Sequence, residues 1–187
     1  DFGDLLLLPL RLAEEDPQSQ DALSRLFDHV LVDEFQDVNQ VQYRLLRLLA
    51  GRSRELVVVG DDDQAIYAWR GADVKIILRF QSDWPDAVVV RLEQNYRSTQ
   101  LILQAANAVI ARNRDRHHKT LFSEQKGGRP VVIYTAENER READFVAQTI
   151  RRLCQEEARE PSDFAVCYRT NAQSRVLEEA LRSSGLL

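Results

Sequence analysis

Short apolar runs that end abruptly in polar residues divide the first half of the chain. Residues 30–32, 56–59 and 87–92 each consist mainly of hydrophobic residues, many of them β-branched. Unbroken runs of this length are typical of parallel strands that are buried on both faces. Between the first two runs, hydrophobic residues in 39–50 recur at helical intervals, and Gly51 supplies a stop. The pattern predicts an α/β fold built on a parallel sheet.

The rest of the chain repeats this alternation of strand and helix patterns. Ser98 or Thr99 can cap a helix whose apolar face continues to residue 110. The further elements that the pattern predicts are helices at 19–29, 73–83, 138–157 and 172–183 and strands at 131–135 and 164–168. Because the later strands begin a new alternation, we expect a separate second sheet. We place the boundary near residue 97, which gives domains at 1–97 and 98–187.

Two acidic residues, Asp33 and Glu34, directly follow the first predicted strand. In open α/β sheets, ligands bind at the carboxyl ends of the strands. A Mg²⁺ ion that is bound to phosphates takes one or two carboxylates from the protein, and a second carboxylate can orient or deprotonate a water molecule. The alternative is that these carboxylates only cap the next helix or face solvent.

Polar and aromatic residues also follow the other two predicted strands. Residues 60–72 read Gly-Asp-Asp-Asp-Gln-Ala-Ile-Tyr-Ala-Trp-Arg-Gly-Ala, and residues 93–99 read Glu-Gln-Asn-Tyr-Arg-Ser-Thr. Together with Asp-Glu-Phe-Gln-Asp at 33–37, these motifs resemble those of the UvrD/Rep-type superfamily 1 DNA helicases. The resemblance covers nearly the whole chain. It implies parts of two RecA-like domains of the P-loop NTPase type and a motor that uses ATP and Mg²⁺.

The resemblance gives five residues a role at the nucleotide. Asp33 would help to hold Mg²⁺ and Glu34 would activate the attacking water, which agrees with their expected place at a strand end. Gln64 is similar to the family's γ-phosphate sensor, with a solvated turn residue as the alternative. Tyr96 would stack on adenine. Arg97 would reach the γ-phosphate as an arginine finger from the same chain, with a structural salt bridge as the alternative.

The resemblance also implies contacts with single-stranded DNA. Tyr67, Trp69 and Arg70 alternate along a stretch that we expect to be extended, only a few residues after the predicted phosphate sensor. Exposed aromatic rings hold single strands by stacking on the bases, whereas burial in the core is the alternative for such residues. In the second half, Arg169 and Asn171 match a strand-to-helix turn that meets a DNA phosphate in the family.

A phosphate-binding loop of the form Gly-x-x-x-x-Gly-Lys-Ser/Thr does not occur in the sequence. In the family this loop precedes the matching segment, so we expect a central fragment that does not hydrolyse ATP alone. The resemblance implies a parent protein that moves 3′ to 5′ along single-stranded DNA and unwinds duplex junctions in repair or replication. The alternatives are the helicase part of a helicase-nuclease and a catalytically silent, helicase-like interaction module.

The composition excludes few classes of protein. A content of 44% hydrophobic and 29% charged residues is ordinary for a soluble protein, and no apolar run is long enough to span a bilayer. We therefore expect a cytoplasmic protein without a membrane partner. Cys154 and Cys167 lack the spacing of a metal or redox site. The basic residues 112–119 resemble a nucleic-acid patch, but a solvated loop is the simpler interpretation.

Overall fold

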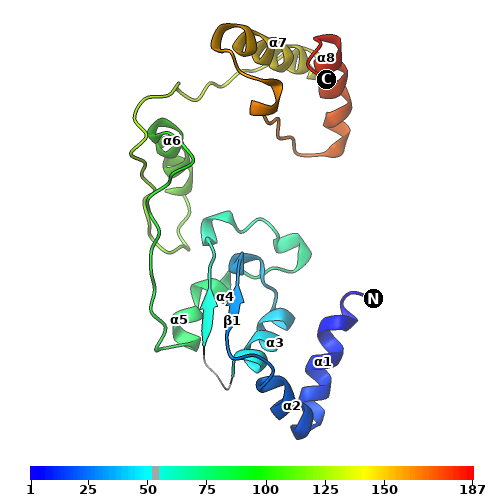
Figure 1. Ribbon diagram of the computed structural model, residues 1–187, viewed down its shortest axis with the longest axis vertical. Helices are drawn as coiled ribbons and strands as arrows, with labels where there is room; N and C mark the ends of the chain where they lie inside the picture. Colours follow the sequence, from blue (N-terminus) through cyan, green and yellow to red (C-terminus); the bar gives the residue numbers. More distant parts are fainter. Residues whose placement is uncertain (52–54) are drawn as a thin grey trace. The chain divides into compact units, whose positions relative to one another are not determined.

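The computed structural model describes residues 1–51 and 55–187, and it combines α-helices with a small parallel sheet (Figure 1). Backbone contacts divide the chain into two compact units, residues 1–130 (unit 1) and residues 131–187 (unit 2). Residues 98–130 therefore belong to unit 1 in this structure. The boundary between motor domains near residue 97 stays a prediction.

Two of the predicted strands pair in unit 1. β1 (Val30–Val32) lies parallel to β2 (Leu56–Val58), which confirms the mixed α/β class with a parallel sheet. The hydrogen bonding continues past both strands, because Val59 N–H donates to Val32 O (2.8 Å) and Phe35 N–H donates to Val59 O (2.9 Å). The two strand ends therefore stay side by side where the polar motifs begin.

One face of this sheet packs on a hydrophobic core. Phe35, Tyr43, Leu46 and Ile76 form the buried centre of the core, and the inward side chains of β1 and β2 pack against it. On the opposite face, the side chain of Leu31 is 76% exposed. The expectation that both faces are buried is therefore wrong for this chain, because none of its described elements covers the outer face.

Local sequence signals set the start of the main helix of unit 1. α3 (Gln40–Ala50) begins with a capping box, in which the Asn39 side chain accepts a hydrogen bond from Gln42 N–H and the Gln42 side chain accepts one from Asn39 N–H (both 2.9 Å). The other helices of this region are α1 (Asp4–Glu15), α2 (Pro17–Ser24), α4 (Lys75–Leu78) and α5 (Phe80–Asp83). The helix predicted at 19–29 thus ends earlier, and the one predicted at 73–83 is broken into two.

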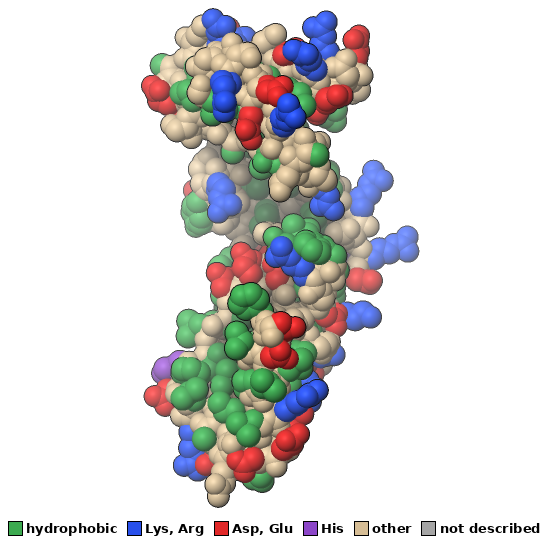
Figure 2. All heavy atoms as spheres, turned by 90° about the vertical axis from the view of Figure 1, so that its right-hand side faces the viewer, with side chains coloured by type: hydrophobic (Ala, Val, Ile, Leu, Met, Phe, Trp, Pro, Cys, Tyr) green, Lys and Arg blue, Asp and Glu red, His purple; other side chains and the backbone are tan. Residues whose placement is uncertain are grey.

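The two N-terminal helices pack beside α3 but leave part of their apolar surface uncovered. Leu5 is 68% exposed and Leu8 is 60% exposed. Figure 2, which faces the side on which α1 lies in Figure 1, shows hydrophobic side chains gathered over this part of the molecule.

Three of the predicted strands do not form, and this part of the sheet prediction is wrong. Residues 87–92, 131–135 and 164–168 are irregular. A strand needs a partner backbone for its hydrogen bonds, and no described segment pairs with these runs. Their side chains are exposed accordingly, with Val88 at 88% and Ile133 at 91%.

After the Tyr-Arg motif, α6 (Gln100–Ile110) forms as predicted. Thr99 occupies the N-cap position, but its side chain makes no capping hydrogen bond, so its predicted role as a cap is wrong. The Asn107 side chain donates to Leu121 O (2.8 Å) and accepts from Leu121 N–H (3.3 Å). These two hydrogen bonds to the backbone of Leu121 hold the segment that follows α6 against the helix.

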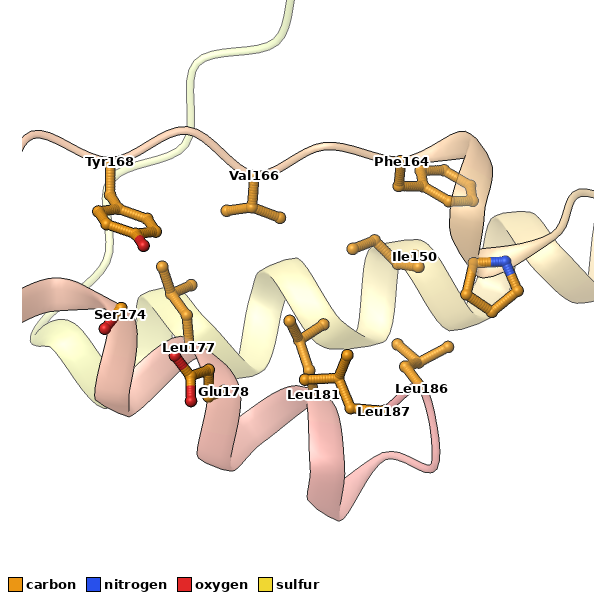
Figure 3. Close-up of a pocket in the computed structure, with 11 residues that line it drawn as sticks. Ile150, Phe164, Val166, Tyr168, Ser174, Leu177, Glu178, Leu181, Leu186 and Leu187 are labelled. Carbon is orange, nitrogen blue, oxygen red and sulfur yellow. The ribbon is translucent and has the colours of Figure 1, made fainter. Parts of the chain in front are cut away.

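Unit 2 is built on two helices, α7 (Glu139–Glu157) and α8 (Ser174–Ser183), which confirm the predicted helices there within two residues. Segment 164–168 turns alternate side chains toward both helices and leaves a cavity of about 230 Å³ (Figure 3). Most residues that line the cavity are apolar, among them Ile150, Phe164, Val166, Tyr168, Leu177 and Leu181. The cavity is therefore a mainly apolar space that is partly open to solvent, with Tyr168 45% exposed.

Replacing Ile76 by alanine should destabilise unit 1 by about 2–5 kcal/mol, because a fully buried isoleucine leaves a cavity in the core. Urea unfolding of the chain, followed by Trp84 fluorescence in a Trp69→Phe background, measures this loss. Ile133→Ala is the matched control, since an isoleucine that is 91% exposed should change the free energy of unfolding by no more than about 0.5 kcal/mol. Equal losses in the two variants would contradict the assigned core.

Candidate functional site

The two acidic residues after β1 lie at the carboxyl end of the strand, as predicted. Both are exposed, and the Asp33 carboxylate accepts a hydrogen bond from Glu34 N–H (2.9 Å). Glu34 adopts a left-handed backbone conformation, with φ 49° and ψ 44°. This conformation is uncommon for a residue that has a Cβ, and such residues concentrate at functional sites. The turn therefore places two adjacent, exposed carboxylates at the end of β1.

A buried glutamine that sequence reasoning did not select lies directly beneath this turn. The Gln36 side chain is only 2% exposed, and its Nε2 donates to Glu34 Oε2 (2.7 Å). Its Oε1 accepts from Asp61 N–H (2.9 Å), at the end of the other strand. A Cβ atom at Gly60 would lie 2.8 Å from this oxygen, so the close approach requires glycine. The only hint of this burial in the sequence is that Gln36 directly follows the hydrophobic residue Phe35.

The acidic turn after β2 is neutralised by a basic segment from beyond α6. Arg116 donates to both carboxylate oxygens of Asp63 (2.8 and 2.6 Å), and both side chains are less than 10% exposed. Lys119 pairs with Asp61 and lies 3.6 Å from Asp62 and 3.4 Å from Asp63. The interpretation of 112–119 as a solvated loop is therefore wrong at Arg116 and Lys119. Both side chains form ion pairs with carboxylates that lie more than 50 residues away in sequence.

The pKa values of Asp61 and Lys119 in this cluster are shifted in the directions that an ion pair favours. Burial alone would raise the pKa of the Asp61 carboxyl, but hydrogen bonds from Lys119 and Gln64, with the Lys119 charge, lower it overall. Burial alone would lower the pKa of the Lys119 ammonium, but its hydrogen bond to Asp61 and the three carboxylates around it raise it overall. Both groups therefore stay charged near neutral pH.

Gln64 ends the short turn Asp62–Gln64 that follows this cluster. Its side chain is exposed and its Nε2 donates to Asp61 Oδ2 (2.9 Å). Hydrogen bonds thus run from Glu34 through Gln36 and Asp61 to Gln64. The structure brings together two of the predicted nucleotide-binding positions that lie 30 residues apart in sequence.

Tyr96 and Arg97 are not joined to this group. The Asn95 side chain accepts from Arg97 N–H (2.9 Å) and from Ser98 N–H (2.8 Å), which fixes a turn with both side chains exposed, Tyr96 at 74%. Among the described residues, neither side chain has a hydrogen bond or an ion pair with Asp33, Glu34 or Gln64. The described chain also offers the Arg97 guanidinium no carboxylate partner.

The predicted DNA-contacting residues of unit 1 form an exposed aromatic cluster. The rings of Tyr67 and Trp69 have centroids 6.3 Å apart, and the Arg70 guanidinium lies over both, 5.2 and 4.7 Å from their centroids. Trp69 is 74% exposed. The stretch is not extended as predicted, because Ala68–Arg70 forms a 3-10 turn that ends at Gly71 with φ +90°. Three side chains thereby face one another instead of alternating.

This aromatic cluster is anchored to the segment that follows the carboxylates. Asp73 N–H donates to Val38 O (3.1 Å), and Ala72 pairs with Asn39 in an antiparallel bridge. Both ends of the loop, Gln64 and Ala72, are thus tied to the turn and helix start that follow β1.

Arg169 and Asn171 lie in unit 2, before α8. The Gln173 side chain accepts from Arg169 N–H (2.9 Å) and Thr170 N–H (3.0 Å), and Asn171 begins the 3-10 turn Asn171–Gln173 that leads into the helix. Both predicted side chains are exposed. The predicted strand-to-helix turn is therefore an irregular segment followed by a helix start, which leaves both side chains available to a ligand.

The donor set suits a magnesium ion that is carried by a nucleotide. Asp33 and Glu34 supply two adjacent exposed carboxylates, the number that Mg²⁺ takes when phosphates and water complete its shell. The described residues contain no group of three or more His, Cys, Asp or Glu side chains placed to hold a metal ion. Within the same residues, no helix has both the length and the hydrophobicity needed to cross a membrane.

Comparison with known protein families accounts for both parts of the chain. Residues 1–85 match the UvrD/REP helicase N-terminal domain, and residues 90–186 match the UvrD-like helicase C-terminal domain. The carboxylates, the glutamine turn and the exposed aromatic rings all lie in the part of the chain that matches the N-terminal domain of this family. The chain belongs to the UvrD-like helicase family, and the resemblance seen in its motifs is confirmed.

Within this family the chain is similar to proteins named ATP-dependent DNA helicase PcrA. It is 48% identical to the protein of Bacillus subtilis over 186 residues and 49% identical to that of Leuconostoc citreum over 181 residues, which are 100% and 97% of this chain. It is 46% identical to a Staphylococcus epidermidis protein over 186 residues. The chain spans about a quarter of the length of these relatives.

Replacing Arg116 by alanine should loosen the acidic turn, because the buried carboxylate of Asp63 loses both hydrogen bonds from the guanidinium and keeps only the Lys119 ammonium, 3.4 Å away. We expect faster amide hydrogen exchange at residues 61–64 and a lower unfolding midpoint for unit 1. The matched control is Arg152→Ala, which removes an exposed pair with Glu156 on α7 that is worth only about 0.3–0.5 kcal/mol. Unchanged exchange at 61–64 in Arg116→Ala would show that the ion pair does not hold the turn.

Proposed function

We propose that this chain is the central part of a DNA motor, in which ATP hydrolysis drives movement along single-stranded DNA. It would contribute parts of two RecA-like domains to a longer parent protein that unwinds duplex junctions, 3′ to 5′, in DNA repair or replication in the cytoplasm. The main support is that Asp33, Glu34 and Gln64 follow two paired strands, and that hydrogen bonds link Glu34 to Gln64 through Gln36 and Asp61. Exposed aromatic rings lie on the loop that begins at Gln64.

The exposed carboxylates fit the binding of Mg²⁺ and ATP. Asp33 would help to hold the ion, which when bound would neutralise charge on the phosphates. Glu34 would orient the attacking water, and Gln64 would hydrogen-bond the γ-phosphate or that water. Tyr96 would stack on adenine, and Arg97 would reach the γ-phosphate when the two motor domains close. The chain alone contains no phosphate-binding loop, and we expect it to have no ATPase activity.

The aromatic cluster fits a platform for bases of a single strand. Stacking on Tyr67 and Trp69 requires no sequence readout, and the guanidinium of Arg70 adds positive charge beside them. Arg169 and Asn171 would hold a DNA phosphate from the second motor domain. Because the aromatic loop begins at Gln64 and is bonded at its other end to Asn39, a change at the nucleotide would reach the DNA through one short loop.

In the parent protein, Arg97→Ala should lower the kcat of ATP hydrolysis by a factor on the order of 10³, because an arginine finger acts on the charge of the transferring phosphoryl group. Tyr96→Ala should instead raise KM with a smaller effect on kcat, since stacking on adenine is equal in the ground and transition states. Steady-state ATPase assays with single-stranded DNA separate the two effects. Near wild-type turnover in Arg97→Ala would remove this residue from the nucleotide site.

In the same protein, Trp69→Ala should weaken binding of single-stranded DNA by about 1–3 kcal/mol, the contribution of one stacked base. Fluorescence anisotropy with a labelled oligonucleotide measures the loss. Trp69→Phe keeps an aromatic face and should retain most of the affinity. A reduced melting temperature in Trp69→Ala without any change in DNA affinity would assign the ring to folding instead of to DNA.

A further inference from the structure

Gln36 carries an amide side chain in the buried interior of unit 1. The residue is 2% exposed, as little as the core residue Tyr43. Burying an amide removes its hydrogen bonds to water, so the position favours glutamine only where the protein replaces those bonds. Both ends of this amide are bonded, to Glu34 and to Asp61.

The two bonds fix the orientation of the amide. Asp61 contributes a backbone N–H, which can only donate, so the oxygen of Gln36 must face β2. The Nε2 group then faces the Glu34 carboxylate, which can only accept when it is ionised. A hydrophobic side chain of similar size would fill the same space but could make neither bond.

Neighbouring residues leave Gln36 little freedom to move. Gly60 lets the second strand end approach so closely that a Cβ there would lie 2.8 Å from Gln36 Oε1 and 2.9 Å from Ile77. On the other side, Glu34 is held in a left-handed conformation, which costs free energy unless surrounding contacts maintain it. The amide of Gln36 is one such contact.

We infer that Gln36 is a positioning residue for ATP hydrolysis, an assignment that rests on the function proposed above. Its amide holds the Glu34 carboxylate at a fixed place relative to the turn that carries Gln64. Asp61 is the shared point, because its N–H bonds Gln36 and its carboxylate accepts from Gln64. A γ-phosphate that is bound at Gln64 and a water that is oriented by Glu34 would thereby keep a constant separation.

The test is Gln36→Met in the parent protein, with steady-state ATPase assays in the presence of single-stranded DNA. Methionine keeps the length and volume of glutamine but makes neither hydrogen bond. We expect kcat to fall by a factor on the order of 10², as for a displaced catalytic group, while KM for ATP stays within about twofold. This split follows because Glu34 would act on the water and not on the bound nucleotide.

Tyr43→Phe is the matched control for a purely structural loss. Tyr43 lies in the same core, and its hydroxyl donates to Asp83 (2.6 Å) away from the strand ends. This variant should lower the melting temperature about as much as Gln36→Met but leave kcat within twofold. If Gln36→Met lowers kcat no more than Tyr43→Phe does, Gln36 is only structural and the assignment is wrong.

Gln36→Glu provides a second variant if the methionine protein does not fold. It keeps an oxygen for Asp61 N–H but replaces the donor toward Glu34 with a second carboxylate. A fall in kcat with unchanged KM supports the assignment, and wild-type kcat overturns it. Glu34→Gln in the same assay tests the proposed function separately. If that variant hydrolyses ATP at the wild-type rate, the role proposed for Glu34 fails and the assignment of Gln36 fails with it. If it loses activity while Gln36→Met is unaffected, only the role of Gln36 is rejected.

Discussion

The parallel hydrogen bonding between β1 and β2 is the constraint on which the candidate site depends. Its register continues past the strands, through Val59 N–H to Val32 O and Phe35 N–H to Val59 O. Because both strands end at the same edge, the residues that follow them must share one small space. Phe35 fixes that edge to the core, because its ring is buried in the core while its backbone N–H donates to Val59 O.

Ion pairs also hold the acidic turn that follows β2. Three consecutive acidic residues after β2 would repel one another in isolation, yet Arg116 and Lys119 bring compensating charge to them from beyond α6. The turn before Gln64 is therefore held from two sides, by the sheet edge and by this basic segment. A segment that reads as a basic patch for DNA instead stabilises the turn that carries the proposed phosphate sensor.

The described chain also leaves hydrophobic surface uncovered in both units. Leu31 on the sheet and Ile133 in unit 2 are exposed, and the three runs of apolar residues without a strand partner show the same imbalance. A β-strand is stabilised by its neighbours, so its local sequence cannot form it alone. Helices satisfy their own backbone hydrogen bonds, which is why α3, α6, α7 and α8 form close to their predicted positions.

The sequence by itself determined the family, the main helices, the first two strands and the place of Asp33 and Glu34 at a strand end, because periodicity and contiguous motifs are local properties. Only the tertiary structure showed that Gln36 is buried between two strand ends and that Arg116 pairs with Asp63. These contacts join residues 25 and 53 positions apart, and no local pattern encodes such a pairing. The register of β1 and β2 brings Gln36 to Asp61, and the folding of the segment after α6 onto the turn brings Arg116 to Asp63, and both exist only when the chain is folded.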